Sequence, residues 1–237
     1  MKNIKLFPNI DEVFENITEY HKAVFFPLLT IDLSEINKGT GKVHFVSVFP
    51  SGQEEYDFPE ENTGYNYIKF KRVNDKYEFD GNIKEIPLLD KAVGWYKEAE
   101  KIYQEHKEKY FTKDKFIKEE DDRRRKIDFN YSYYIEGVTN YWVTKDKFLE
   151  TEKFIQGSAY TYGNDNQERR AYENMDTYDE YYWEYFQELL DELNIEKDII
   201  TFIGTVTGYN YSRLGEDEIS LFINSETNEV LQYFNWS

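Results

Sequence analysis

Two apolar segments separated by a glycine turn constrain the fold most. Residues 25–33 are short, apolar and bounded by turn residues, which is typical of a buried strand. Gly39 and Gly41 follow in a polar turn, where glycine adopts a positive φ at little steric cost. Residues 43–49 are apolar on both strand faces, so we expect a second strand in the centre of a sheet. This order predicts a hairpin.

A similar arrangement recurs near the end of the chain. Residues 202–206, a glycine-bearing loop and residues 219–223 keep the same strand-loop-strand order, which indicates a duplicated unit. We expect strands over residues 199–207, 219–224 and 230–236. Between the two units, residues 65–73 and 76–79 alternate between apolar and charged side chains, which predicts a half-exposed meander.

Helical periodicity is present in three segments. Residues 11–20 repeat apolar side chains at helical spacing, with Asp11 as the expected N-cap. A long helix is expected from Leu88 to Tyr110, after Pro87. Residues 177–193 begin with a capping box. Residues 129–143 are rich in Tyr and Val, and we expect them to form β structure.

These elements predict an α+β fold with a single domain over residues 1–237. The expected architecture is an antiparallel or mixed sheet with repeated strand units and two or three packing helices. The charged run at 118–126 is expected to be a solvated connection between two pseudo-repeated halves, 1–118 and 127–237.

Composition limits the classes of function and partner. The chain has 22 Tyr, 18 Phe and 4 Trp but no Cys, so we expect a ring-rich core without disulfides or thiolate metal sites. The formal net charge of −18 disfavours nucleic acid and anionic membranes as partners, because phosphate binding needs cationic footprints. The first residues lack the apolar core of a signal peptide, so a cytoplasmic location is expected. The oligomeric state stays open.

Few residue patterns point to catalysis. His21, His44 and His106 lack metal-ligand spacing, and His44 is expected to be a packed, hydrogen-bonded histidine. The serine-hydrolase and nucleotide-binding motifs are missing. We therefore expect no catalytic, cofactor-binding or metal-binding residues. An alternative is a carbohydrate-binding protein or hydrolase with an aromatic-lined carboxylate cleft, since acids and rings are abundant.

The most distinctive feature is a run of acids. Residues 173–198 carry ten acidic side chains against Lys197. Five acids fall at three- or four-residue spacing on the expected helix, where like charges destabilise it; they are Glu180, Glu184, Glu188, Asp191 and Glu192. One interpretation is a docking surface for a basic protein partner. The other is a solvated face in an acidic protein.

Several segments resemble the YwqG-like family of bacterial proteins of unknown function. The similar segments are Phe-Pro-Leu-Leu-Thr-Ile-Asp-Leu-Ser-Glu-Ile at 26–36, Gly-Lys-Val-His-Phe-Val at 41–46, Phe-Ile-Gln-Gly-Ser-Ala-Tyr at 154–160 and Glu-Ile-Ser-Leu-Phe-Ile at 218–223. Thr30 stands where the family usually has Gln. The resemblance implies a single α+β domain with repeated strand units and no established catalytic residues. It also implies an occurrence beside bacterial toxin and immunity genes.

Together these features predict a non-enzymatic, acidic, cytoplasmic binding protein. Its expected role is that of an immunity-type protein, which neutralises a basic toxin domain through the acids of residues 173–198.

Overall fold

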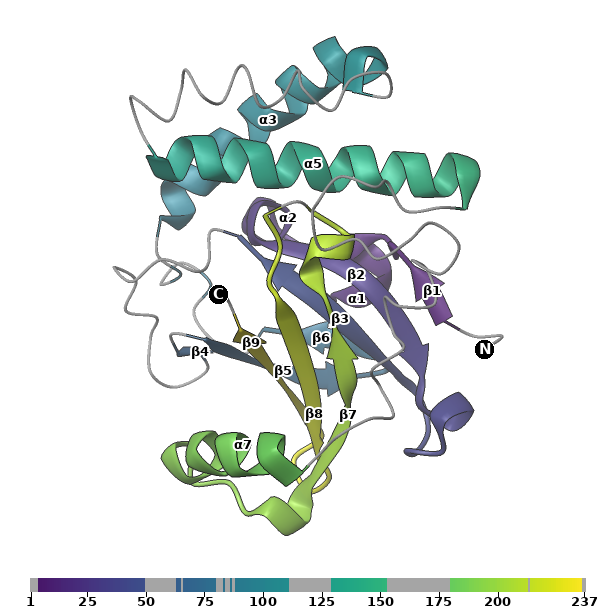
Figure 1. Ribbon diagram of the computed structural model, residues 1–237, viewed down its shortest axis with the longest axis vertical. Coiled ribbons are helices and arrows are strands. Elements are labelled where there is room, and N and C mark those ends of the chain that lie inside the picture. Colours follow the sequence, from purple (N-terminus) through teal and green to yellow (C-terminus); the bar gives the residue numbers. More distant parts are fainter. Residues whose placement is uncertain are drawn as a thin grey trace.

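The computed structural model describes residues 4–49, 63–64, 66–79, 83, 86, 88–110, 129–152, 180–212 and 214–235. These residues form two antiparallel sheets with associated helices, which confirms the predicted α+β fold (Figure 1). Sheet A has the order β1 (Ile4–Leu6), β2 (Phe25–Asp32) and β3 (Lys42–Val48). Sheet B has the order β4 (Thr63–Gly64), β5 (Tyr67–Val73), β9 (Glu229–Asn235), β8 (Glu218–Asn224) and β7 (Ile200–Val206), and β6 (Lys76–Glu78) pairs with β5.

The two predicted strand-loop-strand units are both antiparallel hairpins. β2 and β3 form the first in sheet A, with a register shift between Pro27 and Leu29. β7 and β8 form the second in sheet B, with a register shift between Phe202 and Gly204. A duplication origin for these units, and the two pseudo-repeated halves 1–118 and 127–237, stay predictions. The charged run at 118–126 lies outside the described residues.

The first predicted helix is wrong as a single element. The structure has α1 (Ile10–Val13), which Asn9 caps, and α2 (Glu19–Val24), which Thr18 caps. Between them Phe14 is extended and forms an isolated parallel bridge with Tyr77. The N–H of Glu15 also donates to the carbonyl of Tyr77 at 3.0 Å. Pairing with β6 therefore overrides the helical periodicity of this segment.

The β structure expected at residues 129–143 is also wrong. These residues lie in α5 (Phe129–Thr151), which packs against α3 (Leu89–Tyr110) and lies across one end of the sheets (Figure 1). Every residue from Tyr134 to Thr139 is buried, so this part of the helix has no exposed face. Its sequence therefore lacks the alternation of buried and exposed residues that indicates a helix. Tyr134 donates to the carbonyl of Ala23 and Tyr141 to that of Pro27, both at 2.6 Å. The tyrosines thus pack as core residues with satisfied hydroxyl groups.

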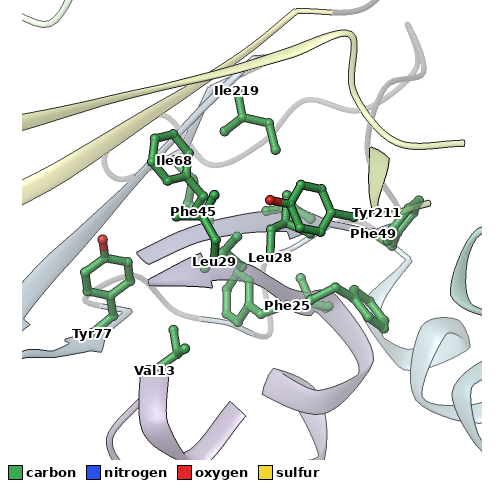
Figure 2. Packing of buried hydrophobic residues seen from close by; sticks show 14 of the residues in the cluster. Val13, Phe25, Leu28, Leu29, Phe45, Phe49, Ile68, Tyr77, Tyr211 and Ile219 are labelled. Atoms are coloured by element: carbon green, nitrogen blue, oxygen red, sulfur yellow. The ribbon is translucent and has the colours of Figure 1, made fainter. Parts of the chain in front are cut away.

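The main core lies between the two sheets and beneath the helices (Figure 2). Its rings interlock: Phe14 stacks on Phe25 with centroids 4.8 Å apart, and Phe70 stacks on Tyr77 at 5.0 Å. Val13, Phe45 and Ile219 are fully buried in the same cluster. Aromatic pairs of this kind stabilise a core beyond the area that they bury. The ring-rich composition is therefore used mainly in packing.

A second, smaller cluster covers the other face of sheet B. There α7 (Glu180–Glu192) packs Phe186 against Phe222 and Tyr233, with ring centroids 4.6 and 5.3 Å apart. Leu189 and Leu190 of the helix are buried in the same cluster. Thr177, the expected cap of this helix, lies outside the described residues. α7 thus has one face fixed against sheet B.

β3 was expected in the centre of a sheet, but it is an edge strand of sheet A by backbone pairing. It is nevertheless buried on both faces, and side chains of other elements bind the backbone groups of its free edge. The hydroxyl of Tyr77 binds the N–H and C=O of His44, at 2.7 and 2.9 Å. The amide of Gln232 binds both groups of Val46, and Glu216 accepts from the N–H of Val48 at 3.3 Å. Three side chains therefore satisfy backbone N–H and C=O groups of β3 that a fourth strand would otherwise pair with.

Candidate functional site

Two surface regions of the described chain have features of a binding site. The first is the exposed side of α7, where the sequence predicted a docking surface. Glu188, Asp191 and Glu192 are exposed there, because Phe186, Leu189 and Leu190 turn the opposite side of the helix onto sheet B. Glu180 and Glu184 belong to the same helix, but their side chains lie outside what the structure describes.

The tertiary structure adds acids from another segment to this surface. Ser225, in the turn between β8 and β9, donates its N–H and hydroxyl to the carbonyl of Ile199, at 2.8 and 3.0 Å. Exposed Glu226 is thereby held beside η5 (Lys197–Ile199) and near Asp198. Figure 1 shows α7 and this turn at the same end of the molecule. We call the exposed set the acidic end; it comprises Glu188, Asp191, Glu192, Glu196, Asp198 and Glu226.

The acidic end has little internal charge compensation. Across the described ranges, ion pairs join Lys5 to Glu12, Lys76 to Glu15, Lys97 to Glu19, Lys101 to Glu105 and Lys147 to Glu150. None of those pairs includes an acid of the acidic end. Asp191 accepts a hydrogen bond from the amide of Gln187 at 2.8 Å, which adds no charge. A negative potential therefore persists over this surface.

The second region is a hollow of about 470 Å³ between α1 and sheet A. Thr30 and His44 are its buried polar residues, Pro8 is also buried, and charged side chains surround them. The lining residues are Ile4, Lys5, Pro8, Glu12, Thr30, Asp32, Lys42 and His44. They come from the three strands of sheet A, from α1 and from the segment between β1 and α1, so the hollow depends on the pairing of sheet A.

His44 is a structural group in this hollow, as the sequence predicted. Its Nε2 lies 2.8 Å from the carbonyl of Asp75, which can only accept, so Nε2 carries the proton. Nδ1 then accepts from the hydroxyl of Thr30, also at 2.8 Å. Burial lowers the pKa of His44 to about 4, so the ring is neutral at physiological pH. Both ring nitrogens are engaged, and neither is available to a metal or substrate.

The two carboxylates of the hollow are held in their ionised form. Hydrogen bonds from Lys5 and from the N–H of Asn9 lower the pKa of Glu12. The hydroxyl and N–H of Ser34 lower the pKa of Asp32. A general acid in a glycoside hydrolase needs the opposite shift. The hollow has no aromatic ring besides His44 among its lining residues, so it does not match the aromatic-lined carboxylate cleft of the alternative hypothesis.

Carboxyl groups with raised pKa values lie elsewhere. Burial raises the pKa of Glu216 to about 7, and burial also raises that of Glu218. The Oε1 and Oε2 atoms of Glu216 accept from the hydroxyl of Ser47, at 2.8 and 2.9 Å, beneath the edge of β3. Glu216 is 1% exposed and does not line the hollow, so it serves the contact between the sheets. Its burial had no signal in the sequence.

Comparison with protein-family models, with curated proteins and with solved structures found no match. The resemblance to the YwqG-like family therefore stays an expectation. Within the described part of the chain, no three His, Asp or Glu side chains are grouped so that they could hold a metal ion. In the same part, no helix has the length and hydropathy needed to cross a membrane.

Proposed function

We propose that this chain is a non-enzymatic binding protein that recognises a basic protein through its acidic end. The observation that carries the proposal is the union of two acidic segments: the Ser225–Ile199 hydrogen bonds bring Glu226 to the exposed acids that follow α7. A surface of one sign raises the association rate of a partner of opposite sign. We include a cytoplasmic, immunity-type role in this proposal, in which the partner is the cationic domain of a toxin.

Three structural properties support a docking role. Glu188, Asp191 and Glu192 extend from a helix that the contact of Phe186 with Phe222 fixes in place, so this part of the surface is preorganised. Their carboxylates form no ion pair with the described lysines and arginines. Like charges on neighbouring helical turns destabilise α7, and a bound cationic surface would relieve that repulsion.

The experiment measures binding to basic domains encoded by neighbouring genes, with poly-lysine as a generic polycation. We expect affinity for the true partner to fall steeply as salt rises from about 0.05 to about 0.3 M, because exposed charge contacts are screened over about 10 Å. The triple variant Glu188→Gln, Asp191→Asn, Glu192→Gln should bind that partner several-fold more weakly, at about 0.2–1 kcal/mol per contact.

A matched variant separates local from net-charge effects. Asp90→Asn, Glu100→Gln and Glu105→Gln remove three exposed acids from α3, at the other end of the molecule. This variant has the same net charge as the α7 triple variant and should keep the wild-type affinity. Equal losses in both variants, or an affinity that salt does not change, would contradict the proposal. Equal affinity for poly-lysine and for the basic domains would show that the surface binds any polycation without specificity.

A further inference from the structure

The hollow between α1 and sheet A has charges of both signs around a neutral base. Lys5 and Glu12 neutralise each other through contacts of 2.5 and 2.7 Å. His44 is neutral, and the Thr30 hydroxyl donates a hydrogen bond to its Nδ1, which leaves the oxygen of Thr30 as an acceptor. The four charged side chains of the lining sum to zero, which disfavours ligands of a single sign.

Asp32 and Lys42 are the pair that a ligand would use. They lie directly opposite each other on β2 and β3, where the Cβ atoms of paired residues are about 5 Å apart. They nevertheless make no ion pair with each other, and Lys42 donates no side-chain hydrogen bond to any residue the structure describes. Asp32 uses Oδ1 for Ser34, which leaves Oδ2 as an acceptor. The charge of Lys42 acts on Asp32, but no ion pair or hydrogen bond joins the two side chains, so an acceptor and a cationic donor lie side by side with hydrogen-bonding capacity left for a ligand.

We propose that this hollow binds a small zwitterion of the α-amino-acid class, with its ammonium group at Asp32 and its carboxylate at Lys42. An α-amino acid carries both groups on one carbon, which matches two charges on directly paired residues. Ile4 and Pro8 supply the apolar part of the lining, so the ligand side chain that fits is aliphatic. The hollow, at about 470 Å³, lies in the size range of small-molecule sites.

The test is a titration of the full chain with L-leucine, followed by backbone amide NMR signals. L-leucine should shift the signals of residues 30–32 and 42–44 in a saturable way below about 10 mM. L-leucinamide lacks the carboxylate and N-acetyl-L-leucine lacks the ammonium group. Both should bind about tenfold more weakly, because each loses a charged hydrogen bond.

Two variants locate the site. Asp32→Asn keeps an oxygen that can accept from the N–H of Ser34 but removes the charge, and Lys42→Gln removes a side chain that makes no hydrogen bond within the described part of the chain. Each should weaken L-leucine binding about tenfold with little change in thermal stability. Lys71→Gln, at an exposed position of β5, should bind as the wild type does. The proposal is overturned if no saturable shift occurs, if the two analogues bind as well as L-leucine, or if Asp32→Asn and Lys42→Gln leave binding unchanged.

Discussion

The side-chain amide of Gln232 forms a pair of hydrogen bonds with the backbone of Val46, which lies 186 residues earlier in the chain. Its Oε1 accepts from the Val46 N–H at 2.8 Å, and its Nε2 donates to the Val46 carbonyl at 2.9 Å. Gln232 is completely buried on the face of β9 that packs against sheet A. The amide therefore makes the same two hydrogen bonds that a neighbouring strand would make, and it links sheet B to sheet A at Val46.

Replacing Gln232 by Leu should destabilise the protein strongly. The substitution leaves the N–H and C=O of Val46 buried without partners, and each unsatisfied group costs about 1–3 kcal/mol. We expect the free energy of unfolding to fall by about 2–5 kcal/mol in urea titrations at fixed pH. Gln187→Leu, on the partly exposed side of α7, is the control and should change stability by less than about 1 kcal/mol. Similar losses in both variants would contradict the role of the Val46 contact.

Glu216 should make stability depend on pH. Burial raises its folded-state pKa from 4.5 to about 7, so the folded protein binds a proton that the unfolded chain releases. The bound proton adds about 3 kcal/mol to the free energy of unfolding. This stabilisation is fully present below pH 4.5 and is lost as the pH rises through about 7. Gln at this position mimics the protonated acid. The free energy of unfolding of the wild type minus that of Glu216→Gln should therefore fall between pH 4 and pH 8. A difference that stays constant over that interval would exclude the buried carboxyl as the cause.

His44 should have the opposite pH dependence. Its folded-state pKa is lowered from 6.5 to about 4, so its contribution is present above pH 6.5 and is lost as the pH falls toward 4. Burial lowers the pKa of His21 as well, which acts in the same direction. Between pH 4.5 and 6.5 Glu216 binds a proton in the folded protein, whereas His44 binds one in the unfolded chain. The effects of these two groups on the pH dependence of stability therefore offset each other.

The measurement for His44 is urea unfolding of His44→Gln across this pH interval. The variant keeps an amide donor for the carbonyl of Asp75 but does not titrate. It will be less stable than the wild type throughout, and the informative quantity is the pH slope. We expect the slope of its stability against pH between 4.5 and 6.5 to be more negative than that of the wild type, because one of the groups that offset Glu216 has been removed while His21 remains. A slope equal to that of the wild type would show that His44 does not take up a proton on unfolding.

Two helical glycines should respond oppositely to substitution by alanine. A β-carbon on Gly137 of α5 would lie 2.8 Å from Cε1 of buried Phe49, so Gly137→Ala should destabilise the fold by about 1–3 kcal/mol. Gly94 of α3 is exposed, and nothing lies within 4 Å of the corresponding position. Gly94→Ala should stabilise by about 0.5–1 kcal/mol through helix propensity. Thermal unfolding of both variants checks the signs, and a stabilising Gly137→Ala would show that α5 lies farther from Phe49.

The acidic helix and the strands could be predicted because their signals are local. Residues 25–33, 43–49 and 219–224 are apolar runs with turn residues beside them, and each became a strand near its expected bounds. Periodicity likewise located α3 and α7. The exposure of Glu188, Asp191 and Glu192 followed from the same periodicity, since the apolar residues of α7 had to face the core.

Local signals failed where an element is buried on several sides. α5 packs against α3 and also reaches β2 through Tyr141, so its apolar residues do not form a single stripe, and its tyrosines resembled those of a strand. The segment after Val13 was expected to stay helical, but Tyr77 pairs with Phe14 and ends the helix. In both cases contacts from distant residues outweigh the local preference.

The sequence by itself determined the α+β class, the two hairpins and the acidic face of α7, because burial patterns of period two or about 3.6 are set by neighbouring residues. Only the tertiary structure decided how the sheets meet, which residues surround the hollow and how Glu226 joins the acids after α7. Those relationships depend on hydrogen bonds such as Gln232–Val46, Glu216–Ser47 and Ser225–Ile199, which link separate elements of the chain. No local pattern encodes such pairs, since their geometry exists only after the sheets have packed.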